Sequence, residues 1–297
     1  MFARPGIAAV ASRLARCAGQ GVRRFLLIVI AVVLVAAIGG AGWFYLASDA
    51  ILDNIYPLPP SSFHAAHGLA AEKEGHRLVT VFGCNACHNP DLRGGYDSYA
   101  HTEAANLTKL APTFSDADFD RAVRHGLAPD GTSIASVMPS DSFQHLTDTQ
   151  LAAIVAYIRG VPPGGDMQPR AFHDIPGRWL ALRGVYHPVQ ERMREPGALD
   201  LGPRTPQGRQ IASALCSVCH GPDLKGQEGS PDLALVAAYD FTDFKTLLRT
   251  GKAAGNREAG EMSQVARGNL KYLTDAEISA LYEYLAARGR KLTGSPG

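Results

Sequence analysis

The pentapeptide Cys-x-x-Cys-His occurs twice in this 297-residue chain, at Cys84–His88 and at Cys216–His220. Two thiols at this spacing can each add to one vinyl group of a single haem, and the adjacent histidine can then bind the iron from the proximal side. Cys-x-x-Cys alone would be ambiguous between a redox disulfide and half of a zinc site. The histidine that directly follows each pair, in both copies, indicates covalent haem attachment.

We therefore predict two covalently bound haem c groups, each containing iron. The residues that would hold them are the thioether-forming Cys84, Cys87, Cys216 and Cys219 and the proximal iron ligands His88 and His220. The fifth cysteine, Cys17, lies in an Arg-rich leader ahead of an apolar run, and we interpret it as an inert free thiol. A lipoprotein signal would need the apolar stretch before the cysteine.

Each haem iron needs a second axial ligand, and methionine is the best candidate in both cases. Met138 lies 50 residues after His88, and Met262, 42 residues after His220, is the only methionine that follows the second motif. A thioether ligand favours ferrous iron and raises the reduction potential relative to two histidines, which suits electron transfer. The alternative is that both methionines fill gaps in the core. We predict that Met138 and Met262 are iron ligands.

Other methionines and histidines are weaker candidates. Met167 and Met193 lie between the two motif regions, and we interpret them as packing residues. His101, His125 and His145 are rival ligands for the first haem. A histidine without a motif around it is more often an ordinary surface or core residue.

The haem motifs lie within an internal repeat, which is more informative than either motif alone. The segment Asp118–Gly126 matches Asp243–Gly251, and Leu146–Gln150 matches Leu273–Glu277. The last two segments predict capping boxes, Thr147 with Gln150 and Thr274 with Glu277. The residues that follow have apolar side chains at helical spacing, and the runs Glu72–Phe82 and Gly208–Leu215 before the motifs also predict helices.

The repeat predicts the organisation of the chain. One helical domain would cover residues 63–160 and a second residues 204–297, each of ordinary small-domain size. Between them, residues 161–203 are rich in proline and glycine, which favours an irregular connector. Within it, Trp179–Leu182 is too apolar for a free linker, and we expect it to pack against one of the domains.

An apolar run without any charge, residues 25–46, follows Arg23 and Arg24. About 20 such residues span a bilayer core. Residues 1–24 contain five arginines and no acidic residue, which predicts a cytoplasmic N-terminus. A cleaved signal peptide is the competing interpretation, but its apolar region is usually shorter and ends in small residues, whereas this run ends in Trp43–Tyr45. We predict an uncleaved single-pass anchor.

This topology agrees with the predicted chemistry, because haem is attached to such motifs on the outer face of the cytoplasmic membrane. We therefore expect both haem domains in the periplasm. The chain has 29 basic and 28 acidic residues. Leaving out the first 50 residues, with five arginines and Asp49, leaves 24 basic and 27 acidic residues, a net charge of −3. Nucleic-acid binding would need a clustered basic surface, and this charge balance does not point to one. A mildly acidic domain instead suits a partner protein with a basic face.

The chain resembles class I c-type cytochromes, and among them the multihaem cytochrome subunits of membrane-bound alcohol and gluconate dehydrogenases. The first domain carries the resemblance in Phe82–His88, Asn106–Thr108, Arg124–Gly126, Asp130–Gly131, Met138–Pro139 and Leu146–Asp148. The second carries it in Cys219–Gly221, Pro231–Leu233, Met262–Val265 and Tyr272–Asp275. The resemblance implies an all-α fold of two tandem cytochrome c domains, here preceded by a transmembrane helix.

Two departures from that family stand out. Its members are three-haem proteins, whereas this chain has two motifs and an N-terminal span. In the family a proline before Asn-Leu-Thr accepts the proximal imidazole N–H through its carbonyl. Pro231 matches this position in the second domain, and Ala105 occupies it in the first, where its own carbonyl can serve the same purpose.

The expected function is electron transfer without catalysis: a membrane-anchored dihaem cytochrome c of a periplasmic respiratory chain. It would take electrons from a dehydrogenase or quinol-oxidising complex and pass them to a soluble cytochrome or terminal oxidase. The alternatives are a haem-bearing subunit of a haem–copper oxidase, a dihaem peroxidase or thiosulfate-oxidising enzyme, and a redox or gas sensor. An enzyme or sensor needs an exchangeable iron ligand, which two methionine ligands would not provide.

Overall fold

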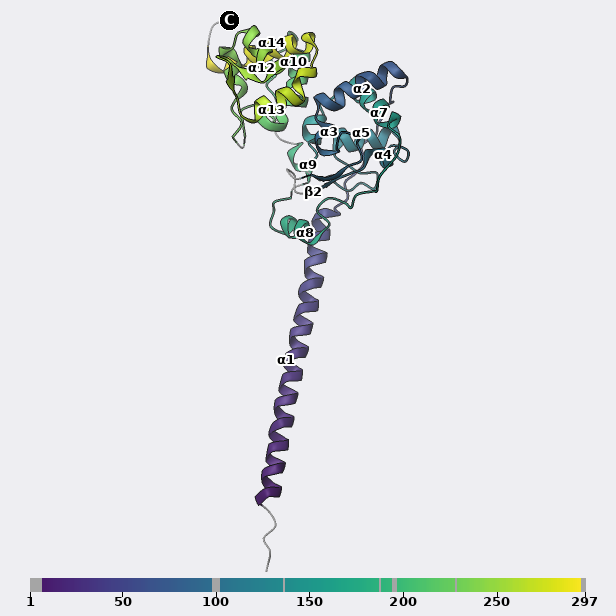
Figure 1. The fold of residues 1–297 in the computed structure, drawn as a ribbon, viewed down its shortest axis with the longest axis vertical. Helices are drawn as coiled ribbons and strands as arrows, with labels where there is room; N and C mark the ends of the chain where they lie inside the picture. The colour runs from purple at the N-terminus through teal and green to yellow at the C-terminus, as the bar shows by residue number, and fades with distance from the viewer. Residues whose placement is uncertain are drawn as a thin grey trace, which may run out of the picture. The chain divides into compact units, whose positions relative to one another are not determined.

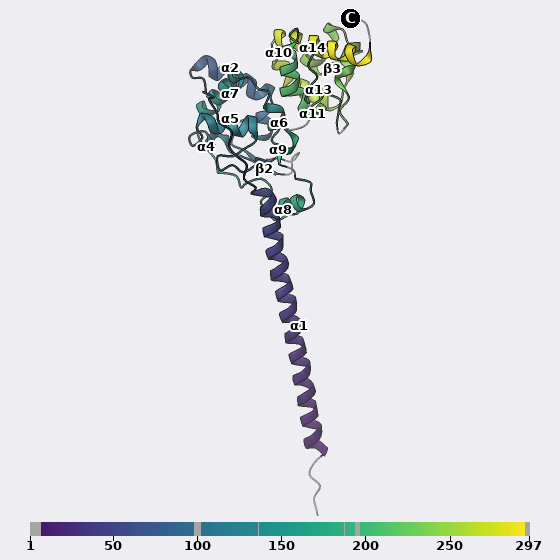
Figure 2. The same ribbon diagram turned by 180° about the vertical axis from the view of Figure 1, so that it is seen from behind.

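The computed structural model describes residues 7–97, 102–135, 137–186, 188–193, 197–227 and 229–294, with the backbone alone for residues 7–21, 97, 102 and 191. The chain divides into two compact units, one that ends at Ile51 and one that begins at Leu52. Each unit is described by itself. Figure 1 and Figure 2 show the chain from opposite sides.

The first unit is one long helix, α1 (Ile7–Leu52), whose last residue belongs to the second unit. Within it, the stretch Val22–Leu52 is long and apolar enough to cross a membrane, by length and composition only. Its apolar side chains are exposed, as Phe25 at 66% and Val35 at 72% illustrate. The helix predicted over residues 25–46 is confirmed, and its insertion in a membrane stays a prediction.

The second unit is mostly helical, as predicted. Its first repeat contains α2 (Leu69–Val81), α3 (Cys84–Cys87), β1 (Gly95–Asp97), β2 (Thr102–Ala104), α4 (Leu107–Leu110), α5 (Asp116–His125), α6 (Ser140–Phe143) and α7 (Asp148–Gly160). Then come α8 (Ile175–Leu182) and α9 (Val189–Arg192). The second repeat contains α10 (Pro206–Ile211), a π-helical turn (Ala212–Cys216), α11 (Ser217–His220), a 3-10 helix (Leu233–Ala238), α12 (Phe241–Thr250), β3 (Lys252–Ala253), β4 (Arg257–Glu258), α13 (Glu261–Gly268), a short 3-10 turn (Leu270–Tyr272) and α14 (Asp275–Thr293).

The strands form two small antiparallel ribbons. In the first, Tyr96 of β1 pairs with Glu103 of β2. In the second, Ala253 of β3 pairs with Arg257 of β4. Each ribbon lies between helices of its own repeat in the chain. The hydrophobic core is formed by the helices together with loop residues such as Phe63, Leu92 and Leu224, and no described strand residue belongs to it.

The helix before each haem motif packs on the terminal helix of its repeat, α2 on α7 and α10 on α14. Figure 1 and Figure 2 both show α2 beside α7. The terminal helices begin at the predicted capping boxes, with Gln150 N–H bound to Thr147 Oγ1 and Glu277 N–H to Thr274 Oγ1, both at 3.2 Å. These side chains satisfy amides that have no partner within the helix. The apolar side chains that follow face the core, including the fully buried Leu151, Val155 and Ile278.

A glycine makes each of these helix crossings close. A Cβ at Gly75 of α2 would lie 1.9 Å from the backbone oxygen of Ala153 in α7. A Cβ at Gly208 of α10 would lie 2.0 Å from the backbone oxygen of Ala280 in α14. The helices can therefore approach to backbone contact only because these two positions lack a side chain.

The region between the repeats is more ordered than its composition suggests. Helix α8 forms despite Pro176, because a proline in the first helical turn loses no needed amide and Asp174 caps the helix by accepting the Gly177 N–H at 3.0 Å. The prediction of an irregular connector was wrong for this stretch. Of the apolar segment expected to pack, Ala181 is buried at 2% exposure, but Trp179 remains 53% exposed.

The connector is also tied to the first repeat. Val189 of α9 is fully buried, and a Cβ at Gly126 would lie 2.1 Å from its Cγ1 atom. Gln190 Nε2 donates to the carbonyl oxygens of His125 and Gly126, each at 3.0 Å. The limits of the two domains and of the connector, 63–160, 204–297 and 161–203, stay predictions.

The two repeats contact each other through equivalent surfaces. Arg77 of α2 donates to both carboxylate oxygens of Glu277, at 2.9 and 3.0 Å, in the capping box of α14. Gln210 of α10 donates to Gln150 Oε1 at 3.0 Å, in the capping box of α7. The helix that precedes each haem motif thus contacts the start of the terminal helix of the other repeat.

Candidate functional site

The first haem motif lies on a separate helical turn. Helix α2 ends at Val81, Gly83 adopts a left-handed conformation with φ 73°, and α3 then carries Cys84 and Cys87. The glycine is required because other residues strain at this φ. Three residues apart on one turn, the two sulfur atoms project from the same side. This is the arrangement that two vinyl groups of one haem need.

The second haem motif is reached without a break in the helix. A π-helical turn, Ala212–Cys216, joins α10 to α11, which carries Cys219 and His220. Such π-turns occur often at functional sites because they insert one extra residue and reorient the side chains that follow. The two repeats therefore present the same motif by different local backbone solutions.

Both proximal histidines are oriented by a backbone carbonyl. His88 Nδ1 lies 2.8 Å from Ala105 O, and His220 Nδ1 lies 2.8 Å from Pro231 O. A carbonyl oxygen can only accept, so Nδ1 carries the proton and Nε2 carries the lone pair that binds a metal. The expectation that Ala105 can replace the usual proline as acceptor agrees with this geometry.

The loops that follow the two histidines have the same two hydrogen bonds. In the first repeat, Leu107 N–H donates to Leu92 O and Gly94 N–H to His88 O, both at 2.9 Å. In the second, Leu233 N–H donates to Leu224 O at 3.0 Å and Gly226 N–H to His220 O at 2.8 Å. Leu92 and Leu224 are both fully buried with positive φ, 59° and 63°. The proximal loop is therefore one structure built twice, and its strain is held by burial.

The first cysteine of each motif has a perturbed thiol. Burial raises the pKa of the Cys84 and Cys216 thiols to about 12. In the part of the chain that the structure describes, no three His, Cys, Asp or Glu side chains are grouped as a metal site would need. One histidine and two thiols at each motif fit haem c.

The predicted methionine ligands are half-buried and pack against the core. Met138 precedes α6, and Met262 is the second residue of α13. A fully buried serine follows each one: Ser140 Oγ donates to Ala122 O at 3.1 Å, and Ser263 Oγ donates to Gly251 O at 2.5 Å. Both methionine loops are thus fastened to the preceding helix or its end. The role of the methionines as iron ligands stays a prediction.

The rival residues have other positions. His125 ends α5, His145 follows α6, and burial lowers the pKa of both imidazoles. His101 lies outside the described residues. Met167 is 51% exposed, so the prediction that it is a packing residue was wrong, whereas Met193 is half-buried.

Three residues that shape the site have roles that the sequence did not predict. Asn106, fully buried, accepts the Lys109 N–H and donates to Gly164 O at 2.8 Å and Asp166 O at 3.0 Å. It thereby ties the carbonyl that holds His88 to the chain that leaves α7. Gly75 and Gly208, nine and eight residues before the first cysteine of each motif, were detectable as helix-interior glycines at matching places in the repeat.

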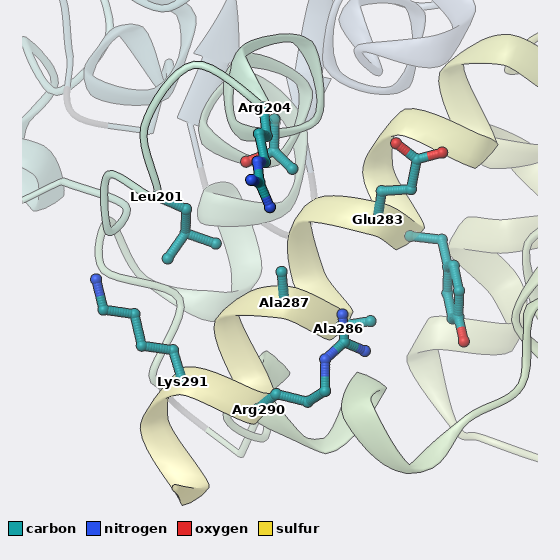
Figure 3. A pocket seen from close by; sticks show the side chains of 9 residues that line it. Leu201, Arg204, Glu283, Ala286, Ala287, Arg290 and Lys291 are labelled. Carbon is teal, nitrogen blue, oxygen red and sulfur yellow. The ribbon is translucent and has the colours of Figure 1, made fainter. Parts of the chain in front are cut away.

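A shallow hollow lies away from both motifs, beside α14. Figure 3 shows its lining, which includes Leu201, Arg204, Glu283, Arg290 and Lys291. None of these is a predicted haem residue. The hollow is therefore separate from the candidate site at the motif loops.

Comparison with known proteins gives matches to both repeats. The model of the Cytochrome c family matches residues 72–162 and 206–288. The chain is 26% identical over 270 residues to the "Fructose dehydrogenase cytochrome subunit" of Gluconobacter japonicus, covering 78% of this chain and 55% of that protein. It is 28% identical over 272 residues to the "Gluconate 2-dehydrogenase cytochrome c subunit" of Pantoea cypripedii, covering 75% and 60%.

A further relative matches along almost its whole length. The "Diheme cytochrome c-type" protein of Cereibacter sphaeroides is 25% identical over 310 residues, covering 89% of this chain and 97% of that protein. The chain spans only about 55–60% of the length of the dehydrogenase subunits.

Proposed function

Because the chain belongs to the cytochrome c family, we propose that it is a membrane-anchored dihaem cytochrome c that transfers electrons in a periplasmic respiratory chain. The observation that carries this proposal is the repeated proximal loop, in which a histidine after Cys-x-x-Cys is held by a carbonyl at 2.8 Å. A fixed imidazole with its lone pair on Nε2 is what axial ligation of a haem iron requires. The protein acts as an electron carrier and not as a catalyst.

Different residues of the chain would attach each haem and bind its iron. Cys84 and Cys87 would hold the first group and Cys216 and Cys219 the second, by thioether bonds. His88 and Met138 would bind the iron of the first haem, and His220 and Met262 that of the second. Each bound haem would supply a one-electron couple between ferric and ferrous iron. Two protein ligands at each iron would leave no position for exogenous ligands.

A dehydrogenase is the proposed electron donor. Two of the relatives are cytochrome subunits of fructose and gluconate dehydrogenases by name. A quinol-oxidising complex is the other candidate donor, and a soluble cytochrome or a terminal oxidase the acceptor. The exposed apolar helix after Arg23 and Arg24 supports single-pass anchoring in the cytoplasmic membrane, with both haem domains in the periplasm.

The test uses the full-length protein extracted from membranes. We expect two haems per chain and no carbon monoxide binding to the reduced protein. In stopped-flow absorbance, both haems should be reduced by a quinol, or by the catalytic subunit of a sugar or alcohol dehydrogenase with its substrate. Peroxide consumption or thiosulfate oxidation by the purified chain alone would refute electron carriage as its function.

A further inference from the structure

A buried arginine lies behind the proximal loop of the second repeat and has no equivalent in the first. Arg288, on α14, is 1% exposed. Its Nη1 atom donates to Asp232 Oδ1 at 2.7 Å, and its Nη2 atom donates to Asp223 O at 2.9 Å. A charge this deeply buried is costly unless it is paired and hydrogen-bonded, and these two contacts supply that pairing.

The two acceptors both lie in the loop that follows the proximal histidine. Asp223 lies in the loop directly after His220, and Asp232 follows Pro231, whose carbonyl holds the His220 ring. A single guanidinium therefore joins the start and the end of the loop that follows His220 and includes the carbonyl that holds its ring. The forked geometry of arginine suits this bridging, whereas the single ammonium of lysine does not.

The first repeat solves the same problem with neutral groups. Asn106 occupies the position of Asp232, directly after the carbonyl that holds the proximal ring, and its amide donates to Gly164 O and Asp166 O. When the repeats are aligned on Asp148 and Asp275, the place of Arg288 is taken by Val161, the residue just after α7. The second repeat has Arg288 because α14 continues for 19 residues where α7 ends after 13.

We propose that Arg288 is a positioning residue that holds His220 through the Asp232 and Asp223 contacts and raises the reduction potential of the second haem. This inference rests on the proposed dihaem function. A buried positive charge favours the reduced iron, because reduction lowers the positive charge at the site. Asp232 is partly exposed, so solvent screens its negative charge more than that of the arginine. The two haems thereby acquire different reduction potentials, because Arg288 holds the second proximal loop with a charged group and Asn106 holds the first with a neutral one.

The test is a redox titration of the full-length protein, which resolves the two haems. Arg288→Met should lower one potential and leave the other unchanged, with at least about a threefold shift in the reduction equilibrium, about 30 mV for a one-electron couple. Asp232→Asn should raise the same potential. The matched control is Arg290→Met, which removes the same charge two residues along α14, beside the hollow in Figure 3.

A second readout separates charge from position. Arg288→Lys keeps the charge but loses the bridge, so the potential should stay near that of the unaltered protein while amide hydrogen exchange in residues 221–234 accelerates. In a chain shown to carry two haems, unchanged potentials in both Arg288→Met and Asp232→Asn, or an equal shift in Arg290→Met, would overturn the role of Arg288 alone. A chain without two haems would overturn the proposed function as well.

Discussion

Replacing the glycines at the two helix crossings by alanine should destabilise the protein, although alanine is the better helix former. A Cβ at Gly75 would lie 1.9 Å from Ala153 O and 2.7 Å from the Tyr157 Cβ atom. At Gly208 the corresponding distances are 2.0 Å to Ala280 O and 2.7 Å to the Tyr284 Cβ atom. Each blocking oxygen belongs to the backbone of a packed helix and cannot rotate away.

The expected loss in the free energy of unfolding is the difference between two opposed contributions. Real Cβ contacts lie beyond 3.0 Å, so the paired helices must separate by about 1 Å. Overpacking of this kind costs about 1–3 kcal/mol, and a rigid backbone obstacle places it at the upper end. The gain in helix propensity from glycine to alanine returns about 1 kcal/mol. Each substitution should therefore lower the free energy of unfolding by about 2 kcal/mol. For a domain of about 60–100 residues, the size expected for each repeat, this corresponds to a decrease in Tm of about 8–16 °C.

The assay is thermal unfolding of the full-length protein in detergent, followed by circular dichroism and by haem absorbance. Gly268→Ala is the matched control, because Gly268 is also helical and a Cβ at this position would meet nothing within 4 Å. It should leave the Tm unchanged or raise it slightly. Since the crossings lie in different repeats, the effects of Gly75→Ala and Gly208→Ala should add in the double variant.

Equal unfolding temperatures of the three variants would refute a helix spacing set by backbone contact. If Gly75→Ala and Gly208→Ala unfold at the same temperature as Gly268→Ala, the helices have room for a methyl group, and backbone contact does not determine their spacing. A loss of stability in only one of the two variants would mean that backbone contact sets the helix spacing in that repeat alone.

Three further predictions follow from the site, the anchor and the contact between the repeats. Met138→Ala or Met262→Ala should leave haem covalently attached but abolish part of the near-infrared methionine-to-iron band and allow imidazole binding, measured by absorbance. Intact mass of the membrane-extracted protein should include residues before Ile51; a chain that starts near residue 48 or 50 would contradict the anchor. Burial would raise the pKa of Glu277, but hydrogen bonds from Arg77 and Thr274 lower it below its ordinary value. Its stabilising contribution is therefore present above pH about 4.3 and lost as pH falls through the lowered pKa, so unfolding of Glu277→Gln should depend less on pH in this range.

The sequence by itself determined the features that depend on local spacing. Cys-x-x-Cys-His needs only five neighbouring residues to define a haem attachment site, and the capping boxes at Thr147 and Thr274 need only four. The apolar faces of the terminal helices follow from a period of 3.6 residues, and the helix across residues 25–46 from uninterrupted apolar composition. These patterns were sufficient to predict an all-α fold with two repeats.

The tertiary structure decided which distant segments meet. Nothing in the local sequence indicates that Gly75 approaches Ala153 or that Arg77 binds Glu277, 200 residues away. The connector shows the same limit, because its proline content suggested irregular chain while Asp174 and the burial of Ala181 stabilise α8.

The role of Arg288 could not be predicted from the sequence, because there it is one more basic residue near the end of an amphipathic helix. Only the packing of α14 against the proximal loop buries it and places it between Asp223 and Asp232. Local patterns follow from covalent geometry and helical period, whereas a buried charge acquires its partners from the fold as a whole.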